Sequence, residues 1–154
     1  MVDPVLDAFT ALAAVALVTA ALYAALSIRE AARAAKYARV LRYMERLLDL
    51  KFVAAITEAR IIWAFPGNDA QKRQHFSELS EREQDRFGAV LNFFEEVCAA
   101  YNAGILDEEM TKRMVGGYIN FFWDKADWFI SHQRLRDDQT FCEWAAAREH
   151  FRNL

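Results

Sequence analysis

Glycine and proline, the residues that most often interrupt a helix, are scarce in this sequence. It contains five glycines and two prolines, and none of them lies between Val5 and Phe65. Because that interval holds no residue that breaks a helix, one helix can run through most of it. The local polarity changes at Asp49, Leu50 and Lys51, so any kink or break is expected there.

Sequence motifs for catalysis are also missing. The three histidines, His75, His132 and His150, lie far apart, and none belongs to an ExxH or HExxH metal-binding motif. The sequence has no glycine-rich phosphate loop, no GxGxxG turn and no GxSxG elbow. We therefore expect no catalytic residue, no cofactor and no metal ion, and a protein that binds partners rather than an enzyme.

The remaining candidates for chemistry have simpler explanations. The two cysteines, Cys98 and Cys142, form no CxxC motif, and both are expected to be small packing residues in a reducing cytoplasm. Glu95 and Glu96 are adjacent, and adjacent helical side chains point about 100° apart, so they do not converge on one substrate. We interpret this pair as a solvated acidic face or a local salt bridge.

Charge is absent from residues 8–28. These 21 residues read AFTALAAVALVTAALYAALSI. A helix of this length reaches roughly 30 Å, the thickness of the hydrocarbon core of a bilayer. The preceding MVDPVLD holds two aspartates and no lysine or arginine, which does not fit the basic start of a secretory signal. The favoured interpretation is an uncleaved transmembrane anchor; a signal peptide and a buried helix of a soluble protein are the alternatives.

A basic segment follows the uncharged stretch. Residues 27–46 hold six cations and two glutamates, a net charge of +4. Because the whole chain carries −3 and Asp3 and Asp7 contribute −2, residues 47–154 carry −5. Cations beside a span stay in the cytoplasm, so the N-terminus is expected outside and the body of the chain inside. The acidic body argues against nucleic-acid binding, and the basic segment either binds anionic lipid or only fixes the topology. This membrane-surface collar comprises Arg29, Arg33, Lys36, Arg39, Arg42 and Arg46.

The sequence after the collar predicts helices only, because no segment alternates with a period of two. Ser80 and Glu83 have the spacing of a capping box, and Gly104 is placed to end that helix in a left-handed conformation. Another helix is expected to start at residue 107 and to contain Gly116 and Gly117, where a closely packed neighbouring helix would explain the glycines.

The final helix is expected over roughly residues 141–152, where Thr140 and Glu143 repeat the capping-box spacing. The fold class is therefore all-α, with a single N-terminal transmembrane helix that continues into a small cytoplasmic helical bundle. Four segments are predicted. They are the N-terminal tail and anchor (1–28), the basic juxtamembrane and connecting helix (29–64), a polar loop (65–79) and a helical domain (80–154), which forms one bundle with 29–64.

Two further features suggest contact with partners. Ala16, Ala20 and Ala24 are spaced four residues apart and could let another transmembrane helix approach, although an alanine-rich helix also produces this spacing by chance. Residues 118–129, YINFFWDKADWF, hold too many large rings for one helical face. One face is expected to pack in the core, and core packing alone is the alternative to a contact surface. The candidate partner surface comprises Phe121, Phe122, Trp123 and Trp128.

Four stretches of the sequence resemble a family of bacterial proteins described only as a domain of unknown function. They are LNFFEEV (91–97), GILDEE (104–109), GGYINFFW (116–123) and FCEW (141–144), and the resemblance covers about residues 30–152. It implies a membrane anchor followed by a helical cytoplasmic domain, in the inner membrane. The sequence departs from the family at Cys98, where relatives often have glycine, and at Phe121 and Trp128, where they often have arginine or proline. The family implies no activity.

Two functions remain as hypotheses. The first is a non-catalytic accessory or scaffold subunit of a larger inner-membrane complex, with membrane lipid and other membrane subunits as its partners. The second is a regulatory or defence-type membrane protein that acts through homo-oligomerisation.

Overall fold

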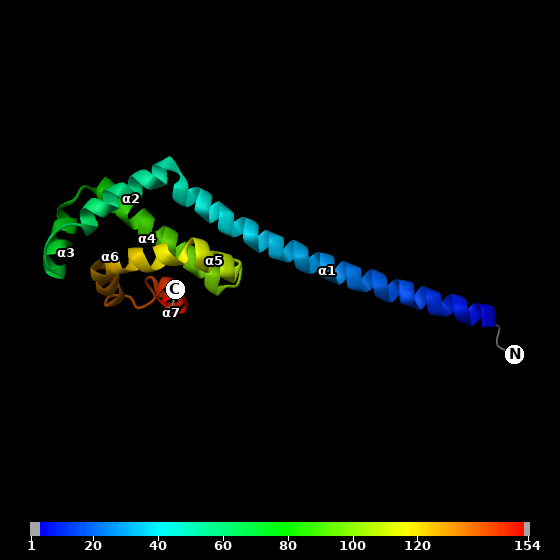
Figure 1. Cartoon of the computed structure of the whole chain (residues 1–154). Coiled ribbons are helices and arrows are strands. Elements are labelled where there is room, and N and C mark those ends of the chain that lie inside the picture. Colours follow the sequence, from blue (N-terminus) through cyan, green and yellow to red (C-terminus); the bar gives the residue numbers. More distant parts are fainter. Residues whose placement is uncertain (1–3, 153–154) are drawn as a thin grey trace. The chain divides into compact units, whose positions relative to one another are not determined.

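The computed structural model describes residues 4–152. Over this range the chain forms seven helices and no strand, so the all-α prediction is confirmed (Figure 1). The helices are α1 (Pro4–Leu48), α2 (Leu50–Trp63), α3 (Asp69–Glu78), α4 (Glu81–Asn102), α5 (Glu108–Met114), α6 (Gly116–Arg134) and α7 (Cys142–Phe151).

The chain divides into two compact units at a point within α1. The first unit ends at Lys36 and the second begins at Tyr37. The division therefore falls inside the expected 29–64 segment, and it separates Arg29, Arg33 and Lys36 of the collar from Arg39, Arg42 and Arg46.

The first unit holds the uncharged part of α1. This helix is long and apolar enough to cross a membrane. From residue 11 to residue 28 every side chain is exposed. Alanine favours the helix, and the hydroxyl of Thr19 donates a hydrogen bond to the carbonyl oxygen of Val15 (2.8 Å), so this polar group is satisfied within the helix itself.

The break expected near Asp49 is confirmed. α1 ends at Leu48, and Asp49 has an extended backbone (φ −60°, ψ 134°). Its carboxylate accepts a hydrogen bond from the backbone N–H of Lys51 (2.8 Å), which satisfies one of the free donors at the start of α2. One aspartate thus separates two apolar helices without glycine or proline.

The polar loop expected over residues 65–79 is wrong in its main part, because Asp69–Glu78 forms α3. The side chain of Asn68 accepts from the N–H of Gln71 (3.0 Å), and the side chain of Gln71 accepts from the N–H of Asn68 (2.9 Å). This reciprocal capping box starts the helix. Phe76 then packs against Phe87 of α4, with ring centroids 5.2 Å apart. A strong cap and one aromatic contact therefore outweigh a composition typical of a loop.

The single helix expected to start at residue 107 and to contain Gly116 and Gly117 is also wrong, because the chain breaks at Val115. This residue (φ −118°, ψ −24°) separates α5 from α6. Gly116 and Gly117 consequently begin α6, and a glycine at a helix end avoids the cost of about 1 kcal/mol that it has in the interior. A Cβ atom at Gly117 would meet no atom within 4 Å, so a closely packed helix does not explain this glycine.

α4 supplies the central apolar face of the second unit and packs against α2 and α7 (Figure 1). The stripe predicted for it is buried at Phe87, Leu91, Phe94 and Cys98, while Tyr101 is half-buried. At its start, the carboxylate of Glu83 accepts hydrogen bonds from the N–H and the hydroxyl of Ser80, which supports the predicted cap. Gly104 follows its end with a φ of +67°, the left-handed conformation expected there.

The cap expected at Thr140 is wrong, because α7 is capped by a distant residue. Phe141 precedes α7 in a left-handed conformation (φ 55°). The carboxylate of Glu95, on α4, accepts hydrogen bonds from the backbone N–H groups of Glu143 (3.1 Å) and Trp144 (2.8 Å). α7 therefore starts at a contact with a distant part of the chain, which the spacing of Thr140 and Glu143 does not indicate.

Candidate binding groove

The collar residues of the second unit bond to the helical bundle. Arg46 donates to the carboxylate of Glu96 (2.7 Å), and its guanidinium carbon lies 5.1 Å from the ring centroid of Phe93. Arg39 donates to the carbonyl oxygen of Ile105 (3.3 Å). These two cations therefore help to hold α1 against α4 and the segment after it. Arg29, Arg33, Lys36 and Arg42 have no such bond to a described residue.

Three of the four residues in the candidate partner surface are buried, which corrects that prediction. Phe122, Trp123 and Trp128 are 4%, 6% and 4% exposed, because α6 has neighbours on several sides: α3, α5 and α7 all pack against it. Phe121 is 47% exposed and is the one member of the set available to a partner. The crowded aromatic run of α6 thus serves mainly the core.

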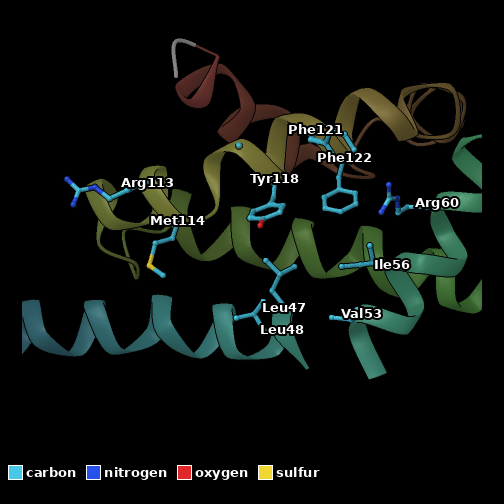
Figure 2. Close-up of a pocket in the computed structure, with 11 residues that line it drawn as sticks. Leu47, Leu48, Val53, Ile56, Arg60, Arg113, Met114, Tyr118, Phe121 and Phe122 are labelled. Carbon is cyan, nitrogen blue, oxygen red and sulfur yellow. The ribbon is translucent and has the colours of Figure 1, made fainter. Parts of the chain in front are cut away.

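An apolar groove lies beside Phe121 in the second unit. It has a volume of 570 Å³ and is formed by the end of α1 together with α2, α5 and α6 (Figure 2). Leu47 and Phe122 line it and are buried, whereas Leu48 and Tyr118, which also line it, are 67% and 46% exposed. The groove is therefore open to solvent along an apolar edge. We call this cavity the α2–α6 groove. Its main apolar residues are Leu47, Leu48, Val53, Ile56, Tyr118 and Phe122.

Cations mark both ends of the groove. Figure 2 shows Arg60 and Arg113 at opposite ends, with the apolar side chains between them. Arg113 is paired with Glu109 on its own helix (3.3 Å). Arg60 forms no ion pair with a described carboxylate. None of the described residues that line the groove is acidic, so its surroundings favour a negatively charged occupant.

The Arg60 end continues into a second cavity. That cavity has a volume of 340 Å³, and Arg60 and Phe121 line it as well as the groove. Lys125 also lines it, with Nζ 5.7 Å from the ring centroid of Phe121. Lys125, like Arg60, has no ion pair with a described carboxylate. Two cations without acidic partners thus flank one exposed aromatic ring.

Glu95, Glu96 and Cys98 were candidates for chemistry in the sequence, and each is accounted for by contacts or burial in the second unit. Glu95 caps α7, and burial raises its pKa although two backbone N–H donors lower it. Glu96 accepts hydrogen bonds from Arg46 and from the hydroxyl of Tyr43 (3.2 Å). The sequence suggested a local salt bridge for the pair of glutamates. The structure instead has a salt bridge between Glu96 and Arg46, which are 50 positions apart in the sequence. Cys98 is buried, which raises the pKa of its thiol well above the usual range. Within residues 4–152 no cluster of histidine, cysteine and carboxylate side chains could hold a metal ion.

Sequence reasoning missed the groove. Its residues come from segments far apart in the chain, around positions 47–60 and 113–122, so no local spacing reports that they meet. One signal was available: in KFVAAITEARIIW, the sequence from Lys51 to Trp63, apolar residues occupy more than one helical face. A helix of this kind has more apolar surface than one neighbour covers.

The family of the chain follows from a comparison with protein-family models. The model described as "Domain of unknown function (DUF4760)" matches residues 11–151. The chain belongs to this family. The match begins inside the uncharged part of α1 and ends at the last residue of α7, so it covers residues of both units of the chain. No curated protein and no solved structure matches the sequence.

Proposed function

We propose that this DUF4760 chain is a non-catalytic accessory or scaffold subunit of a larger protein complex in a bacterial inner membrane. The observation that carries the proposal is the uncovered apolar helix of the first unit: every side chain from residue 11 to residue 28 is exposed. A helix that is apolar on all sides needs lipid or other helices around it. Insertion as a membrane anchor and contact with neighbouring spans would supply both.

The charges beside the anchor support one orientation. Arg29, Arg33 and Lys36 follow the uncharged stretch within the first unit, and the residues before it include Asp3 and Asp7 but no lysine or arginine. Cations beside a span stay on the cytoplasmic side. The N-terminus then lies outside and the second unit lies in the cytoplasm.

The structural roles of Glu95, Glu96 and Cys98 support a binding protein rather than an enzyme. Glu95 and Glu96 are engaged by backbone amides and by Arg46, and Cys98 is buried. The surfaces left for partners are the exposed ridge of Ala16, Ala20 and Ala24 in the anchor and, in the second unit, the area around Phe121.

The proposal is tested by the native mass of the full chain, extracted with a mild detergent from the membrane of its source organism. The test variant carries Ala16→Leu, Ala20→Leu and Ala24→Leu, which keep the helix apolar and fill the ridge. The matched control carries Ala11→Leu, Ala14→Leu and Ala25→Leu, which lie on the opposite face at about 100° per residue.

We expect a complex of fixed stoichiometry with other subunits for the wild type and for the control, and its loss in the ridge variant. A chain that is monomeric in several mild detergents contradicts the scaffold role. A homo-oligomer without other subunits contradicts it too, and favours the regulatory or defence-type alternative.

The orientation has a separate test. Alkaline phosphatase, which is active only outside the cytoplasm, is fused to the C-terminus of the full chain, and a fluorescent protein that folds in the cytoplasm is fused in a parallel strain. We expect fluorescence without phosphatase activity. Active phosphatase would place the second unit outside and contradict the proposed orientation.

A further inference from the structure

We propose that the α2–α6 groove binds the hydrocarbon chain of a fatty acid, with the carboxylate held by Arg60 and Lys125. Every residue involved belongs to the second unit, so the inference does not depend on the proposed scaffold role.

The first argument is the apolar surface that the groove leaves open. Leu48, Val53, Tyr118 and Phe121 are 67%, 40%, 46% and 47% exposed and line one cavity. Clustered exposed apolar side chains on a folded protein mark a binding surface, whereas single ones need no explanation. An occupant with an apolar body would remove this surface from water.

The size of the groove favours a small ligand over a protein partner. Its 570 Å³ lies within the range of about 300–1,000 Å³ that is typical of small-molecule pockets. A stable protein interface instead involves about 20–30 residues of each partner, whereas eleven described residues line the groove. An elongated, flexible hydrocarbon chain suits a groove with apolar side chains on both sides, contributed by α1 and α2 on one side and by α6 on the other (Figure 2).

The charge distribution selects an anionic headgroup and its position. Arg60 and Phe121 are common to the groove and to the adjoining cavity, so a chain lying in the groove would bring its headgroup to that cavity at the Arg60 end. Arg60 and Lys125 have no described carboxylate partner there, whereas Arg113 at the other end is already paired with Glu109. A carboxylate beside two unpaired cations gains charge-assisted hydrogen bonds.

The chain itself offers a way to fill the groove without disturbing the core. Gly117 lines the groove, and an added Cβ atom there would meet nothing within 4 Å. Gly117→Leu should therefore occupy part of the space that the ligand needs. Gly88 on α4 is a matched control, because a Cβ atom there also meets nothing within 4 Å and the residue does not line the groove.

The experiment uses the full chain in nanodiscs of phosphatidylcholine and a palmitic acid analogue that carries a diazirine near the end of its chain. Illumination converts the diazirine to a carbene that inserts into nearby bonds with loss of N₂, and mass spectrometry locates the label. Unlabelled palmitate and hexadecanol, which has the same chain length without the charge, serve as competitors.

We expect labelling of α2 or α6 that palmitate displaces. Hexadecanol should compete about tenfold less well, because it lacks the charge. Gly117→Leu should abolish the label and Gly88→Leu should leave it unchanged. The double variant Arg60→Gln and Lys125→Gln should weaken palmitate competition about tenfold. The melting temperature of its second unit should be unchanged.

Several results would overturn the proposal. Labelling confined to residues 8–28 would mean that the fatty acid only partitions into the bilayer beside the anchor. Equal labelling of Gly117→Leu and the wild type would place the ligand elsewhere, and equal competition by hexadecanol would remove the role of the two cations. A dimer that Gly117→Leu dissociates would show that a second copy of the chain occupies the groove.

Discussion

Leucine has opposite surroundings in the two units of this chain. Leu12, Leu17 and Leu22 in the first unit are 67%, 72% and 61% exposed, whereas Leu47 and Leu91 in the second unit are 4% and 0% exposed. In α4 of the second unit, apolar residues recur at the helical period among charged ones, so this helix has one side to bury against its neighbours. Residues 8–28 contain no charge, so this stretch has no polar side to leave in water.

The comparison teaches that burial within the chain is not decided by residue type alone. The second unit covers most of its apolar side chains with its own helices, whereas the described part of the first unit is a single helix and has no other helix of its own to cover them. Substitutions should therefore separate the two units, with core substitutions affecting only folding of the second and charges in the uncharged stretch affecting only the membrane association of the first.

The largest expected effect is the loss of a buried ring. Trp144 is 0% exposed, its ring centroid lies 5.3 Å from that of Phe94, and its indole N–H donates to the carbonyl oxygen of Ile119 (3.2 Å). Trp144→Ala should lower the free energy of unfolding of the second unit by about 3–5 kcal/mol. Denaturant titration of the full chain in detergent, followed by circular dichroism, measures it. An unchanged midpoint would contradict the packing of α7.

A matched control comes from an exposed apolar residue. Leu135, at the end of α6, is 86% exposed, and Leu135→Ala should change the free energy of unfolding by less than about 0.5 kcal/mol. Both variants should remain in the membrane fraction, since the proposed anchor includes neither residue.

A charge in the middle of the uncharged stretch should have the next largest effect. Val18 lies near its centre, and Val18→Arg should make insertion less favourable by about 3 kcal/mol, because arginine replaces an apolar side chain in the bilayer core. The fraction of the chain that resists extraction by alkaline carbonate measures this change. Leu135→Arg is the control and should stay membrane-bound. If Val18→Arg resisted extraction as fully as the wild type, the placement of Val18 in the bilayer core would be contradicted.

Loss of the Glu95 cap of α7 should have a smaller effect than Trp144→Ala or Val18→Arg. Glu95→Gln leaves one acceptor oxygen for the two N–H groups that Glu95 satisfies, but it also removes a partly buried charge, so the free energy of unfolding of the second unit should change by no more than about 1 kcal/mol. Burial raises the pKa of Glu95 above the ordinary value of 4.5, so the folded chain holds this proton more tightly than the unfolded chain does. The stabilisation from protonation is complete below pH 4.5 and is lost as the pH rises through the folded pKa.

Glu83 provides a comparison in which the pKa is shifted in the opposite direction. Hydrogen bonds from Ser80 hold the pKa of Glu83 below 4.5, so its contribution is present above that pH and is lost as the pH falls through the lowered pKa. As the pH rises, we expect the wild type to lose stability relative to Glu95→Gln and to gain stability relative to Glu83→Gln. Parallel pH profiles for the two variants would contradict the contrast between a buried and an exposed cap.

The features that could be predicted from the sequence are those set by neighbouring residues. The Ser80 and Glu83 spacing, the left-handed Gly104 and the break at Asp49 each depend on interactions within a few positions. The cap of α7 by Glu95 joins positions 48 residues apart, and the groove joins α2 to α6, so no local pattern contained them. The aromatic run of α6 failed as a partner surface for the same reason: its neighbours α3 and α7 cover rings that a single helix would leave exposed.

The smallest expected effect concerns the basic collar, whose cations are divided between the two units. Arg46 pairs with Glu96, and both side chains are 51% exposed, so Arg46→Ala should lower the free energy of unfolding of the second unit by only about 0.5 kcal/mol. The loss should shrink in about 1 M salt, where the Debye length is about 3 Å. Arg29→Ala lies in the first unit and should leave this free energy unchanged, but it removes a cation beside the uncharged stretch, and a topology reporter should respond to it more than to Arg46→Ala. Equal effects of the two variants on unfolding would mean that the collar acts as one continuous surface, because only a shared role would make the paired and the unpaired arginine equivalent.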